Sequence, residues 1–148
     1  MSAPTRTSAG TAEPVATRPA AGRVALVLVV ATLVAIGLNT VVATIAVNAG
    51  AERIPPLTLP VYGGFTVLGL LAGWAGWRLV QRRAARPAAV LRVLVPVVVL
   101  LSFVPDVALL TQRFIPGTTT AGVLALMTMH LVVATVGVTA FAVASRPS

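Results

Sequence analysis

Four long apolar runs, joined by short segments in which the charges gather, dominate this sequence. The runs cover residues 24–47, 57–80, 88–110 and 120–144. Each is long enough to cross a hydrocarbon core of about 30 Å as an α-helix rising about 1.5 Å per residue. Hydrophobic residues make up 57% of the 148 residues and charged residues only 9%, which is too little polar surface to coat a soluble globule. We therefore expect an all-α integral membrane protein, an up-and-down four-helix bundle.

The segment before the first run has a different composition. Residues 1–22 are rich in Ser, Thr, Pro, Ala and Gly and lack apolar periodicity, so we predict a disordered cytoplasmic tail before a transmembrane domain at residues 23–145. A cleavable signal peptide is the alternative, with small residues near Ala46 and Ala49. The first run is longer than the roughly 7–15 apolar residues of a signal peptide. Its length favours a retained helix.

Most of the arginines outside the apolar runs lie on one side of the expected bundle. One side collects those of the tail, of the loop between the second and third runs, and of the C-terminus: Arg6, Arg18, Arg23, Arg82, Arg83, Arg86 and Arg146. The other two loops carry only Arg53, Arg113 and Glu52. Because cytoplasmic loops of membrane proteins are enriched in arginine, we expect a multi-pass protein of the cell membrane with both termini cytoplasmic. The orientation of the protein in the membrane then explains its excess of arginine. We therefore expect the lipid bilayer as its partner and no nucleic acid.

Glycines and prolines predict how the helices pack and bend. Gly69 and Gly73 form a GxxxG motif, which Ala72 and Gly76 extend at the same spacing, and such faces let helices approach closely in lipid. The partner is a helix of the same chain or, alternatively, a second copy or another membrane protein. In the first run, a small polar face is expected to do the same: Gly37, Thr40, Thr44 and Asn48. Pro96 and Pro105 predict a kinked or broken third helix.

Depth along the helices places a candidate intramembrane polar site. Asn39, Tyr62 and Asp106 are expected at one level in the outer half of the bilayer, with His130 about two turns beneath them near the midplane. A carboxylate facing lipid would cost at least about 2.5–3.5 kcal/mol, so Asp106 should face the bundle. One hypothesis makes Asp106 a proton- or cation-binding group. The other, which we favour, makes it a structural tie at the kink, bonded to Asn39, Tyr62 or Arg113.

Two hypotheses are also open for the role of His130. Small residues on its helical face favour a packing role with one interhelical hydrogen bond. A proton relay with Asp106 is the alternative, and the difference in depth argues against direct contact. No cysteine and no second histidine accompany it, so we expect no metal site.

Catalytic motifs are missing from the sequence. It has no acid pair, no Ser/His/Asp set at one depth, no phosphate loop and no HExxH motif. We therefore expect a protein that is not an enzyme and binds no cofactor. A four-helix membrane oxidoreductase that borrows a quinone is the alternative in this class.

Two short segments carry a resemblance. Leu101-Ser-Phe-Val-Pro-Asp-Val-Ala-Leu109 in the third run and Met129-His-Leu-Val-Val-Ala134 in the fourth resemble a family of small four-span actinobacterial membrane proteins of unknown function. The lack of lysine beside abundant Ala, Val and Arg is also typical of a GC-rich bacterial genome. The resemblance implies a four-span fold in a membrane and directs attention to Pro105, Asp106 and His130. We expect an accessory or structural membrane protein that acts through helix contacts; the alternative is a minimal proton-coupled carrier or channel subunit using Asp106 and His130.

Overall fold

The computed structural model describes residues 21–146. Its helices are α1 (Ala21–Asn48), α2 (Leu59–Arg83), α3 (Pro87–Ser102), α4 (Val104–Gln112) and α5 (Thr120–Ala144), with a 3₁₀ turn, η1, at Pro55–Leu57. Over these residues there is no strand, and α1, α2, α3 with α4, and α5 form four spans that are each long and apolar enough to cross a membrane. The predicted all-α four-helix bundle is confirmed. Residues 1–20 of the predicted tail lie outside the described residues, and α1 already begins at Ala21.

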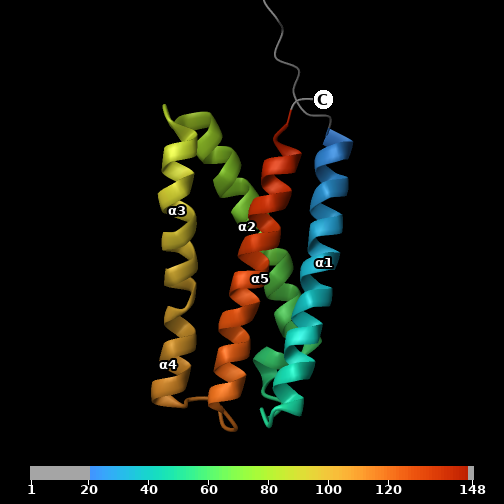
Figure 1. Ribbon diagram of the computed structural model, residues 1–148, viewed down its shortest axis with the longest axis vertical. Coiled ribbons are helices and arrows are strands. Elements are labelled where there is room, and N and C mark those ends of the chain that lie inside the picture. Colours follow the sequence, from blue (N-terminus) through green and yellow to red (C-terminus); the bar gives the residue numbers. More distant parts are fainter. Residues whose placement is uncertain (1–20, 147–148) are drawn as a thin grey trace, which may run out of the picture.

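Helix α5 lies at the centre of the bundle. Figure 1 shows α1 on one side of it, α3 and α4 stacked end to end on the other, and α2 crossing obliquely behind, and α5 contacts each of these helices. The described ends of the chain meet at one end of the bundle, where the Arg23 guanidinium donates to Val143 O and Arg146 O at 3.4 Å each. The α2–α3 connection lies at this same end (Figure 1). We call it the arginine-rich end, and the opposite one the loop end.

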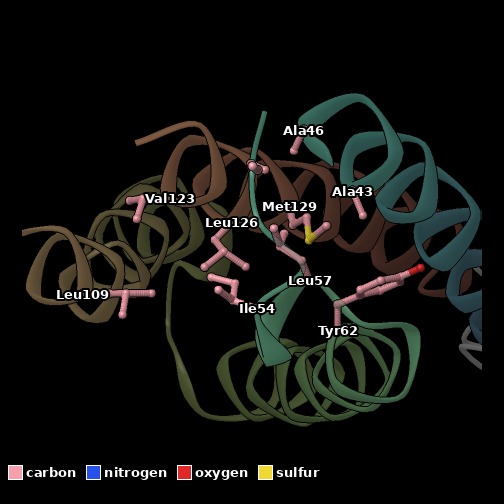
Figure 2. Packing of buried hydrophobic residues seen from close by; sticks show 11 residues of the cluster. Ala43, Ala46, Ile54, Leu57, Tyr62, Leu109, Val123, Leu126 and Met129 are labelled. Atoms are coloured by element: carbon pink, nitrogen blue, oxygen red, sulfur yellow. The ribbon is translucent and has the colours of Figure 1, made fainter. Parts of the chain in front are cut away.

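The core consists of two buried clusters. The cluster at the loop end joins α1, α2, α4 and α5 through Tyr62, Leu109, Val123, Leu126, Met129 and their neighbours. Figure 2 shows Ile54 and Leu57, from the connection between α1 and α2, inserted among these helices. The second cluster lies towards the arginine-rich end and consists of Ala31, Ala35, Leu70, Ala140 and Phe141. Helix α3 has no buried residue, so it is the least enclosed part of the described bundle.

Glycines bring α2 and α5 into close contact. A Cβ added at Gly73 would lie 3.1 Å from the Phe141 ring, and one added at Gly137 would lie 3.0 Å from Leu70 Cδ2. At Gly69 the nearest such atom, in Val133 of α5, is at 3.6 Å, whereas at Gly76 nothing lies within 4 Å. Gly69 and Gly73 therefore pack against a helix of the same chain, and Gly76 does not share that contact.

Helix α1 buries a different face from the one expected. Its buried residues are Ala31, Ala35, Asn39, Ala43 and Ala46. The expected small polar face is exposed instead, and a Cβ at Gly37 would meet nothing within 4 Å. The expectation is wrong because alanine permits close approach as well, and the alanines of α1 occupy the buried face. Thr44 donates to Thr40 O at 2.8 Å and therefore needs no partner on another helix. Thr40 donates to Ile36 O at 2.8 Å and also shares a hydrogen bond with the Tyr62 hydroxyl of α2.

The third span is broken at Phe103, between α3 and α4. Pro105, in the first turn of α4, has no N–H to donate and its ring would clash with the carbonyl of Leu101 in a continuous helix. The amide of Phe103 instead donates to Leu100 O at 3.2 Å. The predicted break is confirmed at Pro105, whereas Pro96 lies inside α3 without ending it.

Substituting Gly73 by valine should lower the free energy of unfolding by about 1–3 kcal/mol, because the new side chain would collide with the Phe141 ring. Gly76→Val is the matched control, since its Cβ enters open space, and should stay within about 0.5 kcal/mol of the parent. Denaturant titration in mixed micelles measures both. Equal losses in the two variants would contradict the internal packing of this motif.

Candidate intramembrane polar site

Asp106 of α4 and His130 of α5 meet between the broken third span and the central helix. Asp106 Oδ2 lies 3.1 Å from His130 Nδ1. The carboxylate is buried, with 5% of the residue exposed, whereas 37% of the His130 side chain is accessible. The imidazole therefore connects a buried acid to the surface of the bundle.

The Asp106 and His130 side chains meet despite the expected gap in depth, so the prediction against direct contact was wrong. Counted from the arginine-rich end, the two Cα positions differ by only about 7 Å. Helical side chains lean towards the N-terminus of their own helix. Because α4 and α5 run in opposite directions, Asp106 leans towards the arginine-rich end and His130 leans away from it. The two side chains converge across the difference in height.

Hydrogen bonding defines the state of the imidazole. His130 Nδ1 lies 2.9 Å from Leu126 O, one turn earlier in α5. Because a carbonyl oxygen only accepts, Nδ1 carries the hydrogen and donates it there. That hydrogen is then directed at Leu126 O and not at the carboxylate, and Asp106 Oδ2 has no hydrogen-bond partner within residues 21–146. The Asp106 carboxylate thus lies close to the imidazole of His130, but its buried Oδ2 accepts no hydrogen bond.

The break in the third span shapes the surroundings of the pair. Phe103, at the break, places its ring edge-on to the His130 imidazole, with the ring centroids 6.1 Å apart. Asp106 lies in the first turn of α4, where the exposed N–H groups of the new helix favour a negative charge. The proline that ends α3 therefore also creates a helix N-terminus next to the carboxylate.

Asn39 and Tyr62 belong to a separate polar contact between α1 and α2. Asn39, which is only 1% exposed, donates from Nδ2 to Thr66 Oγ1 at 3.0 Å. The Tyr62 hydroxyl and Thr40 Oγ1 share a hydrogen bond of 2.9 Å. Neither residue bonds to Asp106 among the described residues, so the members of the expected common layer belong to three separate pairs.

Arg113 does not reach back to Asp106. It is exposed, it ends α4 in the left-handed region with φ 48°, and the ion pair to Asp106 in the described chain comes from His130 alone. The left-handed turn ends the helix at this residue.

Two partners were missed in the sequence. Thr66 lies four residues after Tyr62, on the same face of α2, and that spacing was the available signal. Leu126 takes part through its backbone carbonyl, which every residue has, so no side-chain pattern could have indicated it.

The described residues contain no group of three His, Cys, Asp or Glu side chains able to hold a metal.

The fold and the polar pair define a class: a small helical protein with four spans, a proline-broken third span, and an Asp–His contact between that span and the central helix. Residues 19–147 match a family described as a family of unknown function, DUF6069, and the chain belongs to that family. No curated protein and no solved structure was found to match the chain.

A double-mutant cycle should detect the Asn39–Thr66 hydrogen bond. Asn39→Ala and Thr66→Val should each destabilise the protein, and their coupling energy should be about 0.6 kcal/mol and at most about 1.7 kcal/mol, as for other hydrogen bonds between membrane helices. Unfolding in mixed micelles measures it.

Thr44→Val is the control for that cycle, because the Thr44 hydroxyl bonds only to its own helix. Strictly additive effects of the two changes, with no coupling, would show that this hydrogen bond contributes nothing to stability.

Proposed function

We propose that the Asp106–His130 pair is a proton-binding site, and that the protein is a minimal proton-coupled carrier or channel subunit. The observation that supports this most is the buried Asp106 Oδ2, which lies 3.1 Å from His130 Nδ1 and has no hydrogen bond within residues 21–146. One added proton, on the carboxylate or on the free nitrogen of the imidazole, changes the net charge of the pair from −1 to zero. The pair therefore has the chemistry to take up and release one proton.

The geometry suits a proton site better than a structural tie. A carboxylate that only ties a kink would have both oxygens bonded, because an unpaired buried acceptor is costly. The alternative partners for such a tie, Asn39, Tyr62 and Arg113, are all engaged or placed elsewhere. The break at Phe103 also leaves α4 as a separate helix of nine residues, which can tilt when the charge beside it changes.

The surroundings favour access from the loop end. His130 is partly accessible, and α4 ends at the loop end six residues after Asp106. Towards the arginine-rich end the core is apolar, built from Ala31, Ala35, Leu70, Ala140 and Phe141. A proton crossing the whole membrane therefore requires a movement of helices or a second subunit, which is why we propose a carrier or a channel subunit and not a complete pore. The proposed role is not enzymatic.

Arginine placement supports an orientation. Within residues 21–146, the arginine-rich end carries Arg23, Arg82, Arg83, Arg86 and Arg146, and the loop end carries Arg53 and Arg113. By the positive-inside rule we infer that the arginine-rich end, with both termini, is cytoplasmic. The lack of lysine beside abundant Ala, Val and Arg supports a bacterial cell membrane as the location. The Asp106–His130 pair then lies in the outer half of the bilayer.

A second candidate, an accessory protein acting through helix contacts, is favoured by one observation. Helix α3 has no buried residue, and it presents large apolar side chains around much of its surface, including Val93 at 67% exposure. A partner helix, from a second copy or from another membrane protein, would find its apolar surface uncovered here.

Asp106→Asn tests the proton site. The amide keeps the shape of the carboxylate but cannot take up a proton, so proton flux into reconstituted vesicles should fall to the leak of protein-free vesicles while the helix content is retained. A pH-sensitive dye trapped in the vesicles reports the flux. Glu52→Gln, which removes an exposed acid outside the helices, should leave the flux unchanged.

Two outcomes would overturn the proton-site proposal. One is the absence of flux above leak with the parent protein. The other is an unchanged flux in Asp106→Asn vesicles.

Photo-crosslinking in native membranes tests the accessory role. A photoreactive residue at Val93 of α3 should form an adduct with a second protein, whereas the same residue at Leu33 of α1, 65% exposed, should react with lipid only. Gel mobility distinguishes an adduct of two copies from one with another protein. Recovery of the monomer alone from both positions would count against this role.

A further inference from the structure

A groove opens between α2, α3 and α5 at the arginine-rich end, remote from the Asp106–His130 pair. Its volume is about 560 Å³, within the range of sites that hold small ligands. The lining residues that matter here are Trp77 and Gln81 of α2, Leu91, Arg92 and Val95 of α3, and Val138 of α5.

The groove has the length of one leaflet. Its lining along α3 runs from Pro87 to Pro96, which corresponds to about 14 Å of helix, or roughly half of a hydrocarbon core of about 30 Å. The deeper lining side chains, such as Val95 and Val138, are apolar. Because α3 has no buried residue, its packing leaves this groove open along the side of the bundle, where lipid chains would be.

The polar side chains of the groove come from α2 and α3 and are Trp77, Gln81 and Arg92. Arg92 lies about one and a half turns inside α3, and no carboxylate of residues 21–146 forms an ion pair with it. The Gln81 side chain is fixed by a chain of two hydrogen bonds. Trp77 Nε1 donates to Ser145 Oγ at 3.1 Å, and that hydroxyl donates to Gln81 Oε1 at 3.4 Å. The amide nitrogen of Gln81 forms no hydrogen bond among the described residues.

Arg92 needs a negative partner because of where it lies. An arginine within a membrane span is costly unless its guanidinium reaches a polar group. Helical side chains lean towards the N-terminus, and for α3 that direction leads to the arginine-rich end and the headgroup level. A phosphate there can accept two parallel N–H bonds from a guanidinium.

We propose that the groove binds an anionic phospholipid, with one acyl chain along Leu91, Val95 and Val138 and the phosphate at Arg92. The neighbouring arginines make the headgroup level strongly positive: Arg78, Arg82, Arg83 and Arg86. A net negative headgroup such as phosphatidylglycerol is therefore preferred over zwitterionic phosphatidylcholine. The site is independent of the proposed proton function, and none of its residues contacts Asp106 or His130 in the interactions described above.

Native mass spectrometry of the full chain in detergent tests the site. The protein is titrated with phosphatidylglycerol and with phosphatidylcholine of identical acyl chains. We expect the parent to retain phosphatidylglycerol preferentially, and Arg92→Gln to lose about fivefold in its retention. Arg83→Gln is the matched control, because it removes a charge from the same end without lining the groove. Val95→Trp, which fills the groove, should reduce retention of both lipids.

Three outcomes would overturn the proposal. Equal losses in Arg92→Gln and Arg83→Gln would show diffuse attraction to the arginine-rich end. Unchanged preference in Arg92→Gln would remove the phosphate contact. Binding of glycerol phosphate as strong as that of the lipid would show a site for free phosphate without an acyl chain. Arg92 is exposed, so its substitution should leave the fold intact, and circular dichroism of each variant checks this.

Discussion

Hydrocarbon offers no hydrogen bonds, and this constraint organises the whole bundle. The backbone meets it by forming helices, in which each amide finds a carbonyl within the same segment. Several threonine hydroxyls meet it by donating to the carbonyl four residues earlier, as Thr32 does to Leu28 O at 2.8 Å. Deeper polar groups pair between helices, as Asn39 does with Thr66. Among the described residues, the buried side-chain atoms left without a hydrogen bond are Asn39 Oδ1 and Asp106 Oδ2.

Packing in lipid gains nothing from hydrophobic burial between helices, so close approach has to supply the stability. Helix α1 achieves it with a stripe of alanines, and α2 and α5 with Gly73 and Gly137 facing Phe141 and Leu70. These contacts make α1, α2 and α5 one tightly packed unit. Helix α3 contains no glycine, and it buries none of its residues.

The functional proposals both concern that third span, for one physical reason. Pro105 interrupts it, and the interruption places Asp106 at the start of a new helix beside His130, whose imidazole also contacts the Phe103 ring. At the other end of the span, loose packing of α3 leaves the groove lined by Arg92. The third span is interrupted, and its α3 half buries no residue. It can therefore respond to a proton at one end and to a lipid at the other, whereas α1, α2 and α5 are held by close contacts.

The sequence by itself determined the four spans, the uneven placement of their arginines and the presence of a kink or break in the third span, because hydropathy, charge placement and the missing proline N–H act locally. Only the structure decided that the break occurs at Pro105 and not at Pro96. Only the tertiary structure decided which face of each helix is buried. The rotation of a helix about its axis depends on its neighbours, which is why the alanine stripe of α1 displaced the expected face. The Asp106–His130 contact could not be predicted by counting residues, because counting gives only the depth of each Cα atom. On antiparallel helices the two side chains lean towards each other and bridge the difference in depth.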